Sequence, residues 1–411
     1  MITIFRNARV FDGHNEEILE GVDVVVENNR IREVAANAGA FPDATVIDCK
    51  GRVLMPGLID CHFHAYSPSM DIAGSDHLPP PLMSAHAVRI LEGTLARGFT
   101  TVCDAAGGDI GLWLALEQGL IKGPRFYFAG KALSQTGGHG DMRHGHKHQI
   151  CGCNGYAGSI SLVADGADAV RQAAREELRK GAHQIKLFVS GGGLSPNDPM
   201  LMPQFTEEEI RAAVYEASTR NAYVMAHSHT DASSRRCSEY GVRTIEHGTL
   251  INTRETADIL AKNGTYVVPT LSIVDVLKRN MQAMKLDPAI VDKINSIGNE
   301  SLQAVELCAK AGVKLGLGTD LLDHKFHPEQ GGEFELRAQV QKPIDVLRSA
   351  TSINAEIVQM AGQLGCIKPG ALADILVLDG DPFKDLSLFR NPLKTIPVVM
   401  KDGGFVRNYL S

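Results

Sequence analysis

The sequence lacks several features that are typical of membrane, secreted and nucleic-acid-binding proteins. No uncharged stretch in its 411 residues reaches the roughly 18 residues that a bilayer-spanning helix requires. The first ten residues have neither the apolar core nor the small-residue cleavage site of a signal peptide, so we expect a cytoplasmic protein. The formal net charge of −7 disfavours nucleic acid or an anionic membrane as a general partner.

The eight cysteines do not suggest a disulfide framework in a chain of this length. Cys151 and Cys153 are too close for an ordinary bridge, and no second cysteine pair has the spacing of a zinc site. We therefore expect scattered, reduced thiols. A hydrophobic content of 44% with 22% charged residues is typical of a globular protein and excludes extensive disorder.

Both ends of the sequence have the pattern of short strands separated by turns. The expected strands are residues 2–5, 22–27, 31–34 and 45–48 at one end, and 373–378 and 396–401 at the other. Two β-rich ends flanking a long central block predict a small β-domain that is assembled from residues 1–55 and 365–411.

The central block, residues 56–364, alternates between strand-like and helix-like stretches. After an opening strand at 56–64, we expect strands at 100–104, 126–129, 184–190, 223–229, 244–248, 266–270 and 313–320. The clearest amphipathic helices are 167–181, 206–221, 235–241, 253–263 and 302–312. Thr206 and Glu209 have the spacing of a capping box, and Gly181, Gly241 and Gly312 mark helix ends. Eight β/α units predict an α/β fold, the TIM (β/α)8 barrel.

Alternation along these strands indicates which side chains face the barrel interior. In residues 184–190, Ile185 and Leu187 share one face, whereas Lys186 lies on the other. The aliphatic face of a barrel strand packs against the helices, so Lys186 should point inward. By the same alternation Asp320 points inward from residues 313–320, at the strand end where barrels carry their chemistry.

The opening strand ends in two histidines separated by one residue. In an extended strand His62 and His64 share a face, and Phe63 takes the other. Two imidazoles projecting from a strand end are suited to bind a zinc-class metal. The alternative is a surface strand that carries two histidines.

Four further groups share the inward position at a C-terminal strand end. They are Lys186, His227, His247 and Asp320. Any one of them alone would more readily be a hydrogen-bonded structural residue or, for the aspartate, a helix cap. Together with His62 they form a pattern that chance rarely produces.

The chain resembles the amidohydrolase superfamily, specifically its metal-dependent branch of prolidases and related Xaa-Pro dipeptidases or carboxypeptidases. The resemblance covers essentially the whole chain and is clearest in residues 53–64 and 367–375. It implies that the second of these stretches returns the chain to a terminal β-sandwich, so that the small domain of residues 1–55 and 365–411 would be a β-sandwich. It implies that His62, His64 and Asp320 hold a more buried metal, and that His227 and His247 hold a more exposed one. It also implies that Lys186 bridges the two metals as a carbamate.

The implied cofactors are two divalent metal ions, zinc foremost, bridged by carboxylated Lys186 and a hydroxide. A free ammonium cannot ligate a cation because it has donors only. A desolvated amine, in contrast, can lose its proton, add carbon dioxide and present a bridging carboxylate. Two metals lower the pKa of a bridging water toward ~7 and polarise the scissile carbonyl. Asp320 would then carry the proton to the leaving amine, beyond a role in ligation alone.

The resemblance also points to residues on the substrate side. His139 resembles a residue that supports the substrate carbonyl in this family. His229 occupies a position that is often tyrosine in related peptidases, and the alternative for it is a supporting histidine. Tyr66, Asp104 and Arg143 are further candidates for the pocket. The histidines at 144, 146 and 148 are interpreted as belonging to a solvated loop.

The expected function is hydrolysis of an amide bond in a small substrate, most specifically an Xaa-Pro-type dipeptide or an N-acyl amino acid. The alternative is a mononuclear deaminase or a cyclic amide hydrolase of the imidazolonepropionase type, which does not need a carbamate lysine and is therefore disfavoured by Lys186. A metal-free structural relative is disfavoured because residues suited to all six ligand positions are present. The resemblance also implies a homo-oligomer.

Overall fold

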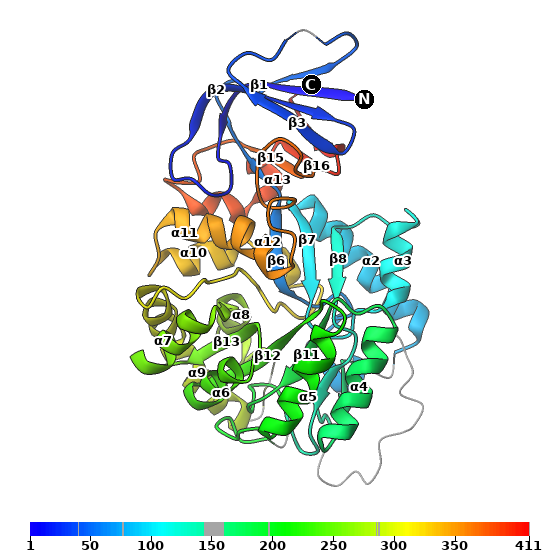
Figure 1. The fold of residues 1–411 in the computed structure, drawn as a ribbon, viewed down its shortest axis with the longest axis vertical. Coiled ribbons are helices and arrows are strands. Elements are labelled where there is room, and N and C mark those ends of the chain that lie inside the picture. Colours follow the sequence, from blue (N-terminus) through cyan, green and yellow to red (C-terminus); the bar gives the residue numbers. More distant parts are fainter. Residues whose placement is uncertain are drawn as a thin grey trace.

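The computed structural model describes residues 1–39, 41–75, 78–143, 160–195, 198–284, 286 and 288–410. A sheet made from both ends of the chain lies at one end of the molecule, and a larger α/β region lies below it (Figure 1). The cysteines at 151 and 153 and the histidines at 144, 146 and 148 lie outside the described residues. Among the described residues, six cysteines are all unpaired and buried.

The terminal sheet has the strand order β17-β16-β15-β5-β1-β2-β3, and β4 also pairs with β1. Its strands are β1 (Ile2–Val10), β2 (Leu19–Glu27), β3 (Arg30–Ala35), β4 (Thr45–Asp48), β5 (Val53–Pro56), β15 (Ile375–Leu378), β16 (Val398–Lys401) and β17 (Gly404–Asn408). Phe5, Val24, Ile375 and Val398 belong to one hydrophobic cluster, so strands from both ends share a core. The predicted β-rich unit of both termini is confirmed.

The larger region contains two parallel sheets, with strand orders β6-β7-β8 and β10-β9-β11-β12-β13-β14. These strands are β6 (Leu58–Phe63), β7 (Phe99–Asp104), β8 (Arg125–Phe128), β9 (Ala132–Ser134), β10 (Ser161–Val163), β11 (Gln184–Phe188), β12 (Tyr223–Thr230), β13 (Thr244–Leu250) and β14 (Tyr266–Val268). The predicted alternation of strands and helices in an α/β region is confirmed.

Helices connect these strands and cover their outer side (Figure 1). They are α1 (Ile72–Ser75), α2 (Pro80–Ala96), α3 (Ile110–Glu117), α4 (Ala167–Arg179), α5 (Glu207–Ser218), α6 (Asp231–Glu239), α7 (Arg254–Asn263), α8 (Leu271–Asn280), α9 (Pro288–Lys310), α10 (Gly332–Ala338), α11 (Pro343–Arg348), α12 (Asn354–Ile357) and α13 (Pro392–Thr395). A π-turn spans Ser349–Ile353, and 3-10 turns span His327–Glu329 and Leu386–Arg390. The capping box of Thr206 and Glu209 is present at the start of α5, as predicted.

The prediction of a regular strand at residues 313–320 is wrong. This stretch forms a single parallel bridge, from Leu315 to Val267 of β14. Some of its backbone groups form hydrogen bonds outside the strand ladder. Leu317 N donates to Ser349 O and to the Asn354 side chain. A side chain at Gly318 would overlap His62, so the stretch passes close to β6. These contacts replace part of a strand ladder and still bring Asp320 beside β6.

The predicted alternation in β11 is confirmed. Ile185 and Leu187 pack in one hydrophobic cluster with Val170 of α4 and Ile210 of α5. Lys186 instead lines a cavity on the inner side of the sheet, where it is 2% exposed. The aliphatic face of the strand thus anchors the helices and directs the lysine inward.

One residue, Gly57, separates β5 of the terminal sheet from β6, which carries His62 and leads directly to His64. A side chain at Gly57 would overlap Thr100 of β7. A glycine therefore permits the close passage of the chain from one sheet to the other.

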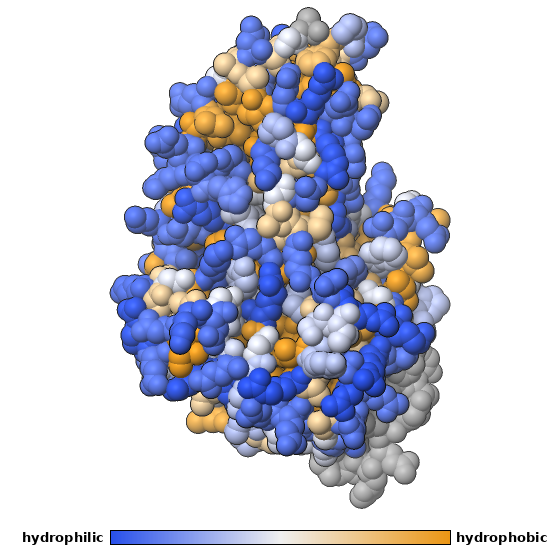
Figure 2. Space-filling model, in the orientation of Figure 1, coloured by the Kyte–Doolittle hydropathy of each residue, from blue (hydrophilic) through white to orange (hydrophobic). Residues whose placement is uncertain are grey.

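The outer surface contrasts with these cores. Figure 2 shows that hydrophilic residues dominate the visible face, with apolar atoms gathered mainly over the terminal sheet. Leu19 and Val46 of that sheet are 44% and 50% exposed. Among the described residues, no helix combines the length and the apolar character needed to cross a membrane.

Candidate metal centre

The structure brings the six predicted ligands together around one cavity with an empty volume of about 720 Å³. His62 and His64 come from β6 and its end, Lys186 from β11, His227 from β12 and His247 from β13. Asp320 reaches the same cavity from the irregular stretch beside β6. Residues far apart in the sequence, on strands of both parallel sheets, thus meet in one cavity.

Two groups of side chains have the spacing of a metal site. Ligand atoms of His62, His247 and Asp320 all lie within 4.8 Å of one another, and so do those of His227, His229 and His247. Asp320 Oδ1 lies 3.0 Å from His64 Nε2 and 3.4 Å from His62 Nε2. The cavity therefore offers two adjacent places for a divalent cation, with His247 common to both.

Each of the five clustered histidines has one ring nitrogen held by a neighbouring group. His62 Nδ1 lies 2.6 Å from Glu246 Oε2, and His64 Nδ1 lies 3.0 Å from the Ala106 carbonyl oxygen. The other three contacts are His227 Nε2 to Gly191 O at 3.2 Å, His229 Nδ1 to Thr249 Oγ1 at 2.7 Å and His247 Nδ1 to Thr270 Oγ1 at 2.7 Å. This arrangement leaves the second nitrogen of each ring for a cation, as is usual around protein-bound metals.

Burial and mutual repulsion keep most of these rings neutral. Burial lowers the pKa of His62, His227 and His247 well below its ordinary value, and neighbouring positive groups add to this effect. The same causes lower the pKa of His229 to about 3. A neutral imidazole has the lone pair that a metal requires. These four donors are therefore ready for a cation at neutral pH. Burial also acts to lower the pKa of His64, but its contact with Asp320 outweighs burial and the pKa is raised overall.

Asp320 is the negative group of the cluster. Burial raises its pKa, but His62, His64 and Lys186 outweigh this effect, so the pKa of Asp320 is lowered overall. The carboxylate is consequently ionised and can ligate a cation or accept a proton.

Lys186 is buried, and the structure shows no hydrogen bond or ion pair for its amine within the described residues. Its nitrogen lies 5.9 Å from the centre of the Phe188 ring. Burial lowers the pKa of Lys186, although Glu246 and Asp320 act in the opposite direction. A buried amine in this position fits the chemistry of a carbamate. The surrounding histidines alone do not explain why a lysine occupies this position.

Left-handed backbone conformations occur at two of the cavity residues. The φ angle is +71° at His247 and +53° at Asp320, a region that costs non-glycine residues free energy. In a regular strand Glu246 and His247 would face opposite sides. The left-handed turn at His247 breaks this alternation, so that Glu246 contacts His62 while His247 still lines the cavity.

Sequence reasoning missed two buried carboxylates that hold the ligands. Glu246 contacts His62, and burial raises its pKa to about 7. Asp60 accepts hydrogen bonds from the backbone nitrogens of His62 and Thr319, at 3.0 and 3.2 Å. The only sequence signal was the position of each carboxylate within two residues of a predicted ligand.

Of the predicted substrate contacts, His139 and His229 line the cavity. The His139 ring stacks on His227 with 4.1 Å between ring centres, and its Nδ1 lies 2.7 Å from Ser195 Oγ. His229 also belongs to a group that could hold a metal. The prediction placed this histidine on the substrate side, with a supporting histidine as the alternative, so its position beside His227 and His247 extends its possible role to ligation.

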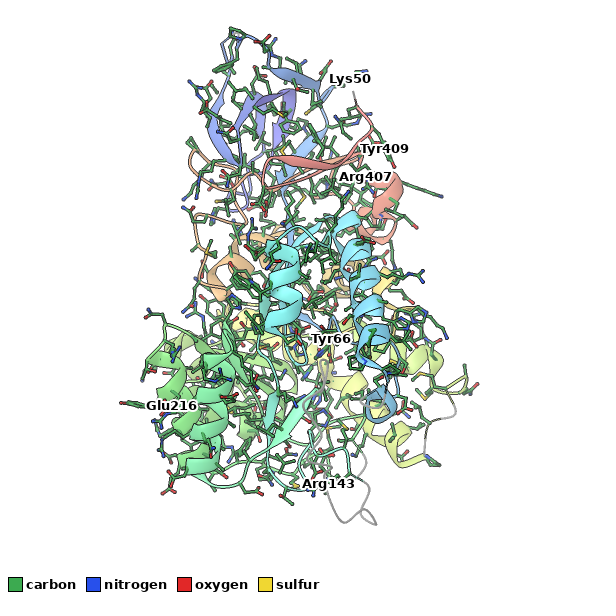
Figure 3. The ribbon with its side chains drawn as sticks, turned by 90° about the vertical axis from the view of Figure 1, so that its right-hand side faces the viewer. Lys50, Tyr66, Arg143, Glu216, Arg407 and Tyr409 are labelled. Carbon is green, nitrogen blue, oxygen red and sulfur yellow. The ribbon has the colours of Figure 1, made fainter. Side chains whose placement is uncertain are left out.

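Tyr66, Arg143 and Asp104 are not among the residues that line the main cavity. The Tyr66 hydroxyl lies 3.5 Å from Asp109 Oδ1, and Tyr66 lines a smaller neighbouring cavity with His64. Arg143 donates two hydrogen bonds to Asp141, at 2.6 and 2.5 Å, and lies far from Tyr66 in Figure 3. Asp104 is buried behind His64, where it accepts hydrogen bonds from the Ala65 and Gly108 nitrogens.

One part of the cavity wall is apolar, which sequence reasoning did not predict. Ile273, Val274 and Leu277 contribute from α8, and Ile297 contributes from α9. They belong to one hydrophobic cluster that also contains Leu322. The cavity thus combines a polar floor of possible ligands with an apolar wall.

Known proteins share this architecture. Ochratoxinase of Aspergillus niger is 31% identical over 372 residues, which cover 85% of this chain and 75% of that protein. A prolidase solved in complex with N-methylphosphonate-L-proline is 42% identical, with a TM-score of 0.96 and coverage of 99% of this chain and 100% of that one. An Xaa-Pro dipeptidase solved with methionine in its active site is 28% identical, with a TM-score of 0.88 and the same coverage. The profile of the amidohydrolase family matches residues 53–406. The chain belongs to the amidohydrolase family of hydrolytic enzymes.

Proposed function

We propose that this amidohydrolase uses two metal ions to cleave the amide bond of an Xaa-Pro-type dipeptide or an N-acyl amino acid. The observation that carries the proposal is the position of Lys186, buried and without a hydrogen bond or ion pair among the described residues, at the cavity that holds both groups of possible ligands. A carbamate on this lysine would give the side chain a role in metal binding, which a structural lysine does not have.

His62, His64 and Asp320 would hold one divalent cation, and His227 and His247 would hold a second. Carboxylated Lys186 would lie between them, and the nitrogen-rich donor set favours zinc. When bound, two such cations supply Lewis acidity toward the carbonyl and an activated water.

The proton transfer falls to Asp320. Its carboxylate is ionised because neighbouring cationic groups lower its pKa. It can therefore accept a proton from the attacking water and pass it to the leaving amine. Among the described residues that line the cavity, no other carboxylate is available for this transfer. His139, with Nδ1 held toward Ser195, is placed to support the substrate carbonyl through its other ring nitrogen.

The apolar wall supports a substrate with an apolar group beside the scissile bond. Ile273, Leu277 and Ile297 would contact this group, while the polar floor would contact the amide. The prolidase complex is informative because its ligand carries a tetrahedral phosphorus on a proline nitrogen. A tetrahedral phosphorus resembles the tetrahedral carbon that forms when water attacks the carbonyl of an Xaa-Pro amide.

We also infer that the two parallel sheets close into a (β/α)8 barrel, beside a β-sandwich domain of residues 1–55 and 365–411. Backbone hydrogen bonds support closure on both sides. Gly316 N donates to Val267 O of β14 at 2.8 Å, and Cys61 N of β6 donates to Leu317 O at 2.9 Å. His183 N, just before β11, donates to Phe128 O of β8 at 2.9 Å.

The alternative activity is that of a mononuclear deaminase or a cyclic amide hydrolase. Such an enzyme would use His62, His64 and Asp320 in a similar way, but it would leave Lys186 without a function. The number of bound metals separates the two possibilities.

The test is a substrate screen with zinc-reconstituted protein, together with metal analysis. We expect about two metals per chain and activity on Xaa-Pro dipeptides or N-acyl amino acids. Activity only on a nucleobase or an imidazolone, with one metal per chain, would overturn the proposal. A cytoplasmic homo-oligomer stays a prediction that cell fractionation and light scattering can test.

A further inference from the structure

A second cavity, with an empty volume of about 450 Å³, lies between α2 and the 3-10 turn His327–Glu329. Its lining residues are His86, Arg89, Ile90, Arg97, His324, His327 and Pro328. None of them lines the cavity of the candidate metal centre. Among the described residues no aspartate or glutamate lines it, and its polar lining side chains are those of histidine and arginine.

His327 is the most unusual of these residues. It is 1% exposed, and neither ring nitrogen has a hydrogen-bond partner in the part of the chain that the structure describes. Its ring packs against Phe63 at 5.2 Å between ring centres. Buried polar groups in proteins are almost always hydrogen-bonded. An unpaired imidazole on a cavity wall therefore points to a polar occupant of the cavity.

Arg97 supplies a fixed positive charge beside it. Its Nε and Nη2 donate to Gln330 Oε1 at 3.1 and 2.7 Å, and Nη2 also donates to Thr94 Oγ1. Since both acceptors are neutral, they orient the guanidinium without neutralising it. Asp60 lies beyond Gln330, and it accepts hydrogen bonds from Thr319 and Gln330.

Arg89 lies at the open side of the cavity. It is exposed, and it forms no ion pair within the described residues. A carboxylate that contacts this cluster is Asp323, whose Oδ1 lies 3.1 Å from His324 Nδ1. The same His324 nitrogen also lies 2.9 Å from the Pro68 carbonyl oxygen. Asp323 therefore contacts the cluster through His324, at the edge of the cavity.

We propose that this cavity binds a small oxyanion, a phosphate or a carboxylate, held by Arg89 and Arg97 with His327 as its buried hydrogen-bonding partner. Guanidinium groups match the geometry of both anions through paired N–H donors. The anion would also supply the partner that the His327 ring lacks. This inference does not depend on the reaction at the metal centre.

A crystallographic experiment tests the location. Crystals of the metal-loaded enzyme are soaked in sodium selenate, and anomalous data are collected at the selenium edge. We expect a peak between Arg89 and His327. A peak at the metal centre alone, or no peak, would overturn the proposal.

A titration tests the same site in solution. Inorganic phosphate and sodium acetate are titrated into the metal-loaded enzyme by calorimetry. Arg89→Ala and His327→Phe should each weaken binding by about tenfold or more, since each removes a hydrogen-bonding partner of the anion. The phenylalanine retains the ring packing against Phe63, and circular dichroism confirms that it folds.

The matched control is Arg220→Ala, which removes an exposed arginine that follows α5. It should bind the anion as tightly as the natural protein. Tighter binding of phosphate or of acetate identifies which of the two anions the cavity prefers. Equal affinity in the natural protein and Arg89→Ala would overturn the proposal, because the anion would then bind elsewhere. The proposal would also be overturned if neither phosphate nor acetate binds.

Discussion

The Nδ1 atom of His62 lies 2.6 Å from Oε2 of Glu246, and both side chains are buried. The other Glu246 oxygen accepts a hydrogen bond from Thr244 Oγ1 at 2.6 Å, so the carboxylate is held on both sides. A carboxylate at this position fixes the tautomer and orientation of the imidazole. Nε2 of His62 is thereby directed toward Asp320, 3.4 Å away.

Replacement of Glu246 by glutamine should weaken metal binding and activity without unfolding the protein. Glutamine preserves the volume but removes the negative charge that orients His62. We expect kcat/KM to fall by about 10- to 100-fold, together with a lower metal content by mass spectrometry. Glu239→Gln makes the same chemical change in a half-exposed ion pair with Arg235 and should have no effect. Unchanged kcat/KM and metal content in Glu246→Gln would show that the contact does not position the ligand.

Lys186→Ala should lose activity by more than about 100-fold and retain fewer metals, because it removes the carbamate. Added acetate or propionate should restore part of the activity, since a small carboxylate can occupy the vacated space. Lys180→Ala is the control, because Lys180 pairs with Glu177 at 2.9 Å outside the cavity. Full metal occupancy in Lys186→Ala would contradict the binuclear site.

Leu277→Ala tests the apolar wall. Loss of this side chain should raise KM for substrates with a large apolar group by about tenfold and leave kcat nearly unchanged. The smallest substrates, which do not reach the wall, should be affected less. Val276→Ala is the matched control, since Val276 is buried in the same helix but does not line the cavity. Equal changes in KM for large and small substrates would show that the wall does not contact the substrate.

The metal-free protein should lose stability as the pH falls below about 6.5, the ordinary pKa of histidine. Burial lowers the pKa of His229 to about 3, so the unfolded chain binds a proton at this residue at pH 5 whereas the folded chain does not. The free energy of unfolding therefore decreases with falling pH, by up to about 2 kcal/mol per such histidine between pH 6.5 and 5.

Urea denaturation of the metal-free protein at several pH values measures this effect. His229→Gln should show a shallower loss of stability over the same interval. Histidine-selective NMR provides an independent check, because the His229 signals should not titrate between pH 5 and 8. A titration of His229 near pH 6.5 would contradict the prediction.

Local patterns were sufficient to predict the six residues at the cavity. The alternation in β11 depends on side-chain direction alone, and it correctly placed Lys186 inward and Leu187 toward the helices. The spacing of His62 and His64 was informative for the same reason. Their roles as ligands stay a prediction.

Features that arise from contacts between distant segments were not predictable. The side chain of Asn354 replaces part of the ladder at Leu317, so the stretch 313–320 is irregular despite its alternating sequence. The contact of Glu246 with His62 depends on a left-handed backbone at His247, which no sequence pattern indicated. The apolar wall requires α8 and α9 to pack side by side, and the prediction contained only the second half of α9.

The position of β5 has a consequence for biosynthesis. This strand lies one residue before β6, and it pairs with β1 on one side and with β15 on the other. Residues 53–56 leave the ribosome long before their partners at 375–378 are made. Domains generally fold in the order of their synthesis. In this chain, however, the strand that leads to His62 gains its second neighbour only after the whole α/β region between them has been made, so we expect the centre to acquire its metals after residues 375–378 have paired with β5.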